Sequence, residues 1–289
     1  MNAETKGMLV GGLGIATFGV TLPVTRWIAP EFGGAFIGLG RAVFAAFLAG
    51  LVLLAVRPGW PSAPQFKRLI GVAAGVVVGF PLLASMAMDS VPASHGGIVL
   101  GLLPLGTALA GVLVSHERPS FGFWLCGLVG AGFVIGFALQ EGAGQLQLGD
   151  LALVGAIVCA SMGYAIGGKL ATELGGWQVI SWGLILALPF VAWPMYQNLP
   201  ADLTSIPQAK WFGFAYLCIV SQYLGFFLWY KGLALGGIAR VSQVQLLQPF
   251  VTLGVAAAFL GEFLGTAALV ALVAVTVSVA LGRRMPIRA

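Results

Sequence analysis

The sequence has few charged residues. Only 8% of its 289 residues are Asp, Glu, Lys or Arg, whereas about a quarter are charged in an ordinary soluble domain. Hydrophobic residues make up 59%, in apolar runs that recur along the whole chain. A run of about eighteen apolar residues is long enough to cross the hydrocarbon core of a membrane as a helix. This composition excludes a soluble globular protein and indicates a multi-pass membrane protein.

Paired cysteines and basic clusters are also lacking. Cys126, Cys159 and Cys218 fall inside apolar runs without the spacing of a metal site or a disulfide framework, so we interpret them as small core residues. We expect no metal and no cofactor. The net charge of +5 comes from single residues between apolar runs, and no basic run is interleaved with aromatic residues. A nucleic-acid partner is therefore not expected.

Ten hydrophobic helices are predicted when the chain is divided at its charges and at its Pro and Gly clusters. The first twelve residues contain one lysine and no convincing cleavage site, so we expect the first helix to be retained. Short connections make successive helices antiparallel neighbours. The predicted ranges are 8–27, 33–56, 68–88, 92–114, 121–139, 149–171, 177–196, 211–234, 238–260 and 264–282.

The distribution of Lys and Arg predicts that both termini are cytoplasmic, because cytoplasmic loops are enriched in these residues. With the N-terminus inside, eleven of the fourteen basic residues fall on the cytoplasmic side. Arg26 and Lys210 fall outside, and Arg41 lies within a predicted helix. An odd number of helices would break this alternation.

Short motifs recur between the two halves of the chain. Residues 102–104 (Leu-Leu-Pro) recur as 247–249 (Leu-Gln-Pro) at an offset of 145, and in each half a glutamate, Glu117 or Glu262, follows the proline by thirteen residues. Proline and glutamate also mark helix ends where no repeat exists. A second, independent match is therefore needed.

Residues 31–34 (Glu-Phe-Gly-Gly) supply that match, since they recur as 173–176 (Glu-Leu-Gly-Gly) at an offset of 142. We interpret the chain as two repeats, 1–145 and 146–289. Each would hold five helices, an odd number, so the second must enter the membrane from the opposite side. Inverted repeats of this kind are typical of secondary transporters, whose substrate site lies near the midplane between them.

These motifs resemble a known family. The chain is similar over nearly its whole length to EamA-type members of the drug/metabolite transporter superfamily. The second repeat carries the resemblance in Tyr230-Lys231-Gly232-Leu233-Ala234, Leu246-Leu247-Gln248-Pro249 and Gly261-Glu262, and the first in Arg26, Arg41, Pro104 and Glu117, with Lys169 placed like Arg26.

The resemblance implies an all-α, ten-helix exporter of small metabolites in the cytoplasmic (bacterial inner) membrane, with a cavity between the two halves. A branch that exports amino acids, including aromatic ones, is the most similar. Two features depart from the family pattern: His116 precedes Glu117 where glycine is usual, and no arginine in the seventh helix matches Arg41.

Arg41 is the strongly charged residue that lies well inside a predicted span. Placing an arginine near the middle of the bilayer costs roughly 3 kcal/mol on insertion scales, so a compensating interaction is expected. One interpretation is attraction for a substrate carboxylate. The other is hydrogen bonding to helix-end carbonyls, or extension of the side chain to the nearer interface.

No Asp or Glu lies in the middle of a predicted span, so the usual carboxylate proton carrier is missing. His95, at the start of the fourth helix, is the side chain there that titrates near neutrality. It is either a proton site or an interfacial polar residue. Facilitated export, exchange and proton coupling all stay open.

Polar groups mark one face of the ninth helix. Ser242, Gln245 and Gln248 stand at i, i+3 and i+6, and polar groups in hydrocarbon need partners, so this face points inward. It either lines a cavity or bonds to a neighbouring helix. Further candidates for the cavity lining are Thr17, Thr21, Phe80, Ser85, Ser161, Tyr164, Trp182, Gln222, Phe226 and Trp229, and candidates for helix breaks or gates are Pro23, Pro81 and Pro249.

Glycines spaced four residues apart predict close helix packing, on which association in lipid depends. The predicted seams are Gly71-Gly75-Gly79, Gly97-Gly101, Gly132-Gly136 and Gly163-Gly167.

We therefore expect a transporter whose partners are a small molecule and the bilayer; its oligomeric state stays open, and a monomer is compatible with the sequence. A multidrug or cation carrier is the alternative. A channel is disfavoured because no ring of like polar groups recurs across the repeats. A membrane enzyme is disfavoured because Asp89, Ser90, Ser94 and His95 share one short turn and form no nucleophile elbow.

Overall fold

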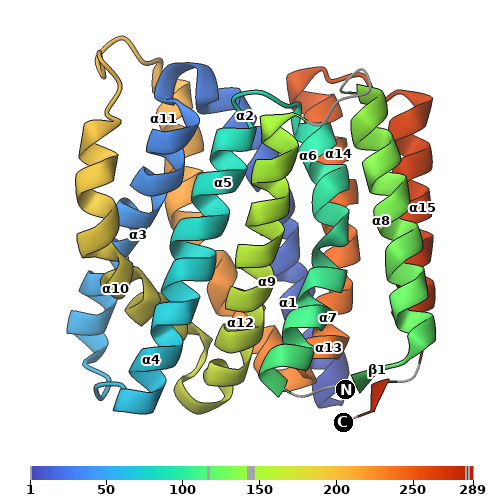
Figure 1. Ribbon diagram of the computed structural model, residues 1–289. Helices are drawn as coiled ribbons and strands as arrows, with labels where there is room; N and C mark the ends of the chain where they lie inside the picture. Colours follow the sequence, from blue (N-terminus) through green and yellow to red (C-terminus); the bar gives the residue numbers. More distant parts are fainter. Residues whose placement is uncertain (1, 116–117, 142–146, 284, 286, 289) are drawn as a thin grey trace.

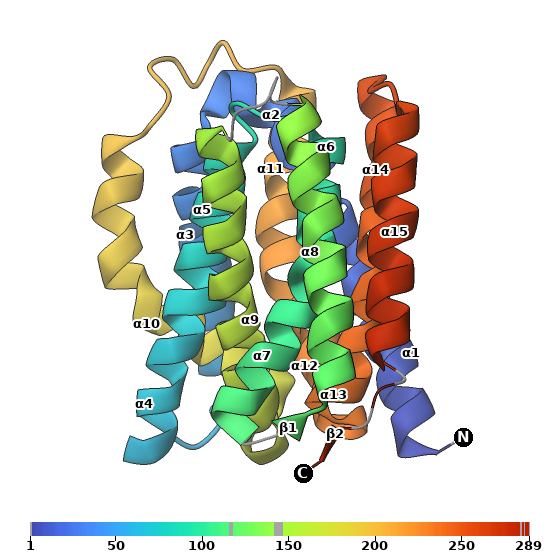
Figure 2. The same ribbon diagram turned by 45° about the vertical axis from the view of Figure 1, so that its right-hand side comes forward.

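The computed structural model describes residues 2–115, 118–141, 147–283, 285 and 287–288. They form a bundle of upright helices, and the chain begins and ends at the same end of it, which we call the terminal end (Figures 1 and 2). The opposite end is called the distal end. The strands described are β1 (Arg118–Pro119) and β2 (Ile287–Arg288), two residues each, which pair antiparallel at the terminal end. The expected all-α class is confirmed, these two short strands apart.

The elements of the two halves follow one another in the same order. The first half contains α1 (Ala3–Gly19), α2 (Thr21–Phe32), α3 (Gly34–Val56), α4 (Ala63–Val72), η1 (Ala73–Gly79), α5 (Phe80–Ala87), α6 (Ala93–Val99), η2 (Leu100–Leu102), α7 (Leu103–Ser115) and α8 (Phe121–Glu141). The second contains α9 (Leu148–Leu174), α10 (Gly176–Gln197), α11 (Gln208–Tyr216), η3 (Leu217–Leu224), α12 (Gly225–Gly236), α13 (Ile238–Val241), η4 (Ser242–Leu246), α14 (Leu247–Leu260) and α15 (Thr266–Arg283).

Several of these elements join end to end into longer rods. Seven stretches in the described part of the chain are long and apolar enough to cross a membrane: Thr5–Phe32, Gly34–Val56, Ala63–Ala87, Ala93–Val114, Leu148–Leu174, Gly176–Gln197 and Gln208–Gly236. They coincide with seven of the predicted ranges. The other three predicted ranges coincide with shorter apolar helices, Trp124–Phe137, Val244–Leu260 and Thr266–Ser278.

The two halves run in opposite directions. The chain enters α1 at the terminal end, whereas it enters α9, the first helix of the second half, at the distal end (Figure 1). Helices from different halves pack closely, above all α1 with α12, α3 with α10, α9 with η1 and α5, and α8 with α15. The interface between the halves thus extends through the whole bundle.

Departures from regular helix geometry recur at equivalent places in the two halves. The third rod of each half contains a π-helical segment, η1 or η3, and the fourth contains a 3-10 segment, η2 or η4. The first rod of each half ends at a glycine with positive φ, 72° at Gly33 and 82° at Gly175. Such angles are strained for other residues, which explains why the Glu-x-Gly-Gly motif is repeated.

Prolines follow these irregular segments closely. Pro81 is the second residue of α5 after η1, and Pro249 is the third residue of α14 after η4. Pro23 is the third residue of α2, just after the interruption between α1 and α2 at Val20. Proline lacks the N–H that would bond one turn back, so the hydrogen-bond ladder of a regular α-helix is interrupted near it.

Glycines bring the helices of the two halves into close contact. A methyl group added at Gly75 would lie 2.5 Å from the carbonyl oxygen of Cys159, and one added at Gly14 would lie 3.0 Å from that of Gly225. The predicted seams of Gly71, Gly75 and Gly79 and of Gly163 and Gly167 therefore do pack tightly. Gly97 and Gly101 likewise face the second half, against Thr252 and Val275.

The seam predicted at Gly132 and Gly136 is wrong. A methyl group added at either position would meet nothing within 4 Å. Both glycines line a groove of about 540 Å³ beside α15, together with Phe133 and Ala267. The four-residue spacing places two glycines on one face of a helix, but it does not determine that another helix contacts that face.

The outer surface of the bundle is apolar. Large hydrophobic side chains are exposed on many of its helices, including Leu54 at 73%, Phe190 at 77% and Phe259 at 82%. Exposure of so much apolar surface to water is unfavourable, whereas its contact with apolar lipid tails is not. The surface is therefore that of a protein embedded in a bilayer.

Candidate functional site

Arg41 lies in the interior, and its exposed fraction is 2%. Its Nη2 donates a hydrogen bond of 2.7 Å to Oγ of Ser221 in η3. The Ser221 hydroxyl is in turn 2.7 Å from that of Thr21, the first residue of α2. The side chain therefore does not extend to an interface, as one interpretation of the sequence held. It joins a polar cluster made by both halves.

The helix interruptions place these groups. Thr21 follows the break at Val20, and Ser221 lies in the π-helical turn of η3, where one extra residue per turn rotates the side chains relative to a regular helix. Ser221 and Gln222 are both buried as a result. Gln222 Nε2 donates to the carbonyl oxygen of Val76 in η1 at 3.1 Å, so the two π-helical segments are linked.

The cluster has unused hydrogen-bonding capacity. Arg41 Nε and Gln222 Oε1 are buried without a hydrogen-bond partner among the described residues. In that same part of the chain, no carboxylate forms an ion pair with Arg41. Buried polar groups are normally satisfied, so the unpaired ones at this position are available to hydrogen-bond a polar ligand.

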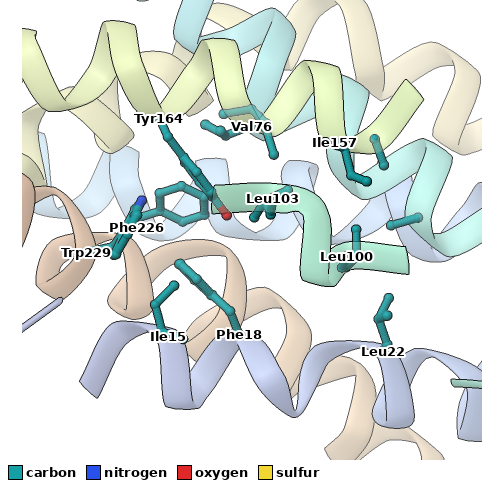
Figure 3. Close-up of a cluster of buried hydrophobic side chains, with 14 of the residues drawn as sticks. Ile15, Phe18, Leu22, Val76, Leu100, Leu103, Ile157, Tyr164, Phe226 and Trp229 are labelled. Carbon is teal, nitrogen blue, oxygen red and sulfur yellow. The ribbon is translucent and has the colours of Figure 1, made fainter. Parts of the chain in front are cut away.

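Aromatic side chains pack in the interior between the two halves. Figure 3 shows Tyr164 of α9 directed toward Phe226 and Trp229 of α12, with Phe18 of α1 below them. The ring centroids of Tyr164 and Trp229 are 5.3 Å apart, and those of Phe18 and Phe226 are 5.0 Å apart. Trp229 is fully buried, and its Nε1 has no hydrogen-bond partner in the described part. Three of the predicted lining residues thus form one cluster with Phe18.

The polar face predicted for residues 238–260, which form α13, η4 and α14, is buried. Part of this face lies on the 3-10 segment η4. Ser242, Gln245 and Gln248 are each at most 3% exposed. The Thr107 hydroxyl of α7 lies 3.3 Å from Oε1 of Gln245. Gln245 Nε2 and Gln248 Oε1 have no hydrogen-bond partner among the described residues. One contact between helices is therefore present, and two polar atoms are left for a ligand.

The remaining predicted residues are distributed through the bundle. Thr17 donates to the carbonyl oxygen of Gly14 in its own helix, as threonine often does. Ser85 and Ser161 are buried, and Phe80 is half-buried. Trp182 is also buried and packs against Trp60 at a ring-centroid distance of 5.0 Å.

His95 is buried, with an exposed fraction of 4%. Its Nε2 lies 2.6 Å from Oδ1 of Asp150. Asp150 was not predicted as a site residue because it lies at the predicted start of a span, where an acid is interpreted as a helix cap. It does act as one, since Oδ2 accepts from the N–H of Gln147 at 2.8 Å.

Two ion pairs link the halves at opposite ends of the bundle. At the terminal end, Arg68 Nη1 of α4 lies 2.6 Å from Oε1 of Glu173 in α9. At the distal end, Lys210 Nζ of α11 lies 3.2 Å from Oε1 of Glu31 in α2. Both members of the second pair are displaced by 142 residues from those of the first. The two pairs are thus the same contact made by each repeat in turn.

Comparison with known proteins agrees with the two-repeat arrangement. The model of the EamA-like transporter family matches the chain twice, over residues 5–139 and 147–282. The chain belongs to the EamA-like transporter family. Glu117, which belongs to the first-repeat motif, and His116, which departs from the family pattern, lie outside the described residues.

Two curated relatives align with most of this EamA-like chain. "Uncharacterized transporter YdeK" of Bacillus subtilis is 42% identical over 284 residues, covering 98% of this chain and 99% of the relative. "Protein PecM" of Dickeya dadantii is 27% identical over 260 residues, covering 86% and 84%. A solved crystal structure at 14% identity has a TM-score of 0.68 and covers 96% of both chains, which supports the fold alone. The protein is therefore a multi-pass membrane transporter of this family.

Proposed function

We propose that this protein is a secondary transporter that exports small metabolites, chiefly amino acids including aromatic ones, across the cytoplasmic membrane. Its two inverted repeats alternate between states in which the site between them opens to one side or the other. Family membership supports the transport function, and the opposite directions of α1 and α9 support the inverted repeat.

The proposed substrate class is inferred from the buried position of Arg41. A buried guanidinium needs a counter-charge, and its present partner, Ser221, is a neutral hydroxyl. A carboxylate beside Nε and Nη2 would accept two charge-assisted hydrogen bonds. Tyr164, Phe226 and Trp229 form a buried aromatic cluster in the interior between the same two halves. An amino acid with an aromatic side chain fits this combination of one cation and several rings.

We also propose how the helices are oriented in the membrane. Ten helices cross the membrane, the terminal end faces the cytoplasm, and the distal end faces outward. The excess of Lys and Arg predicted on the side of the termini supports this orientation. Arg41 is the eighth residue of α3, which begins at the distal end, so in this topology it lies in the outer half of the bilayer.

Transport by purified protein in proteoliposomes tests the function. We expect counterflow of radiolabelled phenylalanine that saturates with concentration. Flux that never saturates would instead indicate a channel, and turnover without flux an enzyme. Movement of a cationic drug or a sugar conjugate, with none of the twenty amino acids moving, would exclude the proposed substrate class.

Replacing Arg41 tests its role. Arg41→Gln keeps a polar side chain but removes the charge, and the loss of a charge-assisted hydrogen bond, about 1.5–3 kcal/mol, predicts a tenfold to hundredfold rise in the concentration for half-maximal counterflow. Arg57→Gln, at the end of the same helix, is the matched control and should leave transport unchanged. Unaltered affinity in a folded Arg41→Gln variant would remove Arg41 from the site.

A further inference from the structure

Among the Asp, Glu, His, Lys and Arg residues in the described part of the chain, three have buried side chains: Arg41, His95 and Asp150. Arg41 belongs to the candidate transport site. The other two contact each other, and their contact joins the two repeats. His95 is the third residue of α6 in the first repeat, and Asp150 is the third residue of α9 in the second.

The pair is enclosed by protein. Each side chain is 5% exposed, and the Nε2–Oδ1 distance is 2.6 Å. The ring of Phe137 in α8 lies 5.3 Å from the imidazole, centroid to centroid. Gln147 donates its backbone N–H to the other carboxylate oxygen. Both side chains lie near the distal end, where α6 and α9 begin.

The charge of the pair depends on one proton. With a neutral imidazole and an ionised carboxylate, the pair carries a net charge of −1, and an isolated charge is costly in surroundings that exclude water. In the described residues, no Lys or Arg forms an ion pair with Asp150. Binding one proton gives an imidazolium and a carboxylate with no net charge. The ligand that neutralises this contact is therefore a proton.

Three other charged groups at this end, Glu262, Arg26 and Asp89, have backbone partners. Glu262, which follows the end of α14, accepts hydrogen bonds from the N–H groups of Ala93 and Ser94 and so caps α6. Arg26 of α2 donates to the carbonyl oxygen of Met88.

Asp89, in the turn before α6, accepts from the N–H of Gly34. Burial raises the pKa of Asp89, against the opposing effects of the Gly34 N–H and the Arg26 charge. Both Asp89 and Glu262 are therefore carboxylates that must be controlled for in a test of the pair.

We propose that His95 and Asp150 form a proton-binding site between the two repeats, and that the bound proton is exchanged for substrate during transport. The coupling rests on the proposed transport function. Separation of α6 from α9 hydrates the pair, so its proton exchanges with the solution on that side. With the distal end outward, a proton binds from outside and must be released to the cytoplasm in the state that opens to the terminal end, as one substrate molecule moves outward.

The proton site can be measured without a substrate. The chain has two histidines, so in a His116→Asn background His95 is the one histidine that ring-labelled histidine reports in an NMR titration. We expect a reversible titration whose midpoint shifts in Asp150→Asn and stays unchanged in Glu262→Gln and Asp89→Asn. Asparagine keeps an oxygen that can cap Gln147, so helix α9 should still form. A midpoint that is the same in Asp150→Asn would overturn the site.

Coupling is measured in proteoliposomes with phenylalanine as the probe. A pH gradient should drive phenylalanine uphill in the unmodified protein, and His95→Gln and Asp150→Asn should lose at least nine-tenths of that uphill transport but keep counterflow at equal pH. Glu262→Gln should retain both. Uphill transport that survives in His95→Gln would contradict the coupling. If no amino acid moves but the NMR titration behaves as expected, the proposed substrate fails while the proton site stands.

Discussion

At the residue scale, single side chains decide how closely the halves approach and what the interior can bind. Gly75 is an example, because a methyl group there would lie 2.5 Å from the backbone oxygen of Cys159, and 3.0 Å from the backbone of Gly163. Backbone cannot move aside as the end of a flexible side chain can. Contact between η1 and α9 therefore requires glycine at this position.

Gly75→Ala should lower the stability of the protein by about 1–3 kcal/mol, the usual cost of overpacking an interior. The matched control is Gly132→Ala, where an added methyl group meets nothing. Thermal unfolding in detergent should show a lower midpoint for the first variant and an equal or higher one for the second. Equal unfolding midpoints for Gly75→Ala and the unmodified protein would mean that η1 and α9 can move apart at this position without loss of stability.

The site residues differ in how far the sequence could predict them. Arg41 was found because a lone charge inside an apolar span is conspicuous. Ser221 was missed because serine is common in such spans, and only the π-helical turn of η3 directs it to Arg41. Asp150 was missed because its partner, His95, is 55 residues away and meets it only in the folded chain.

At the element scale, the two repeats make the same ion-pair contact once at each end of the bundle. Arg68 with Glu173 joins α4 to α9, and Lys210 with Glu31 joins α11 to α2. In each case one member belongs to the first repeat and the other to the second. Any rocking of one repeat against the other changes the separation of these partners.

Charge exchange tests the terminal-end pair. Glu173→Arg places two positive side chains together, so we expect this end to open and, in a cysteine-free background, cysteine-reactive reagents to reach Leu69→Cys, a buried position of α4, more rapidly. The double variant Arg68→Glu with Glu173→Arg should restore the rate. The effect should decline at high salt, since exposed pairs contribute only about 0–1 kcal/mol and are screened. Equal labelling of all three proteins would show that the pair does not hold this end closed.

At the scale of the whole molecule, the helices were predictable and their internal irregularities were not. Apolar length and charge placed the helical ranges within a few residues, because a membrane span must be long and uncharged. The π-helical turns η1 and η3 leave no signature in the sequence. The inverted arrangement was predictable from the repeated motifs and the odd number of helices predicted for each half.

Labelling from outside the cell tests the orientation. In a cysteine-free background, Asp202→Cys lies in the connection between α10 and α11 at the distal end, and Ser62→Cys lies before α4 at the terminal end. An impermeant maleimide should label position 202 in intact cells and position 62 only after lysis. The reverse pattern would invert the proposed topology.

The close seam between α1 and α12 has a consequence for biosynthesis. Gly7 and Gly11 contact the backbone of Gly232, and Gly14 contacts that of Gly225, so α1 packs on a helix that is made more than two hundred residues later. Until then its glycine face has no permanent neighbour in the bilayer. A nascent chain that stops before residue 225 should therefore expose α1 to membrane quality-control proteases. Synthesis of the second repeat should then protect α1 from proteolysis.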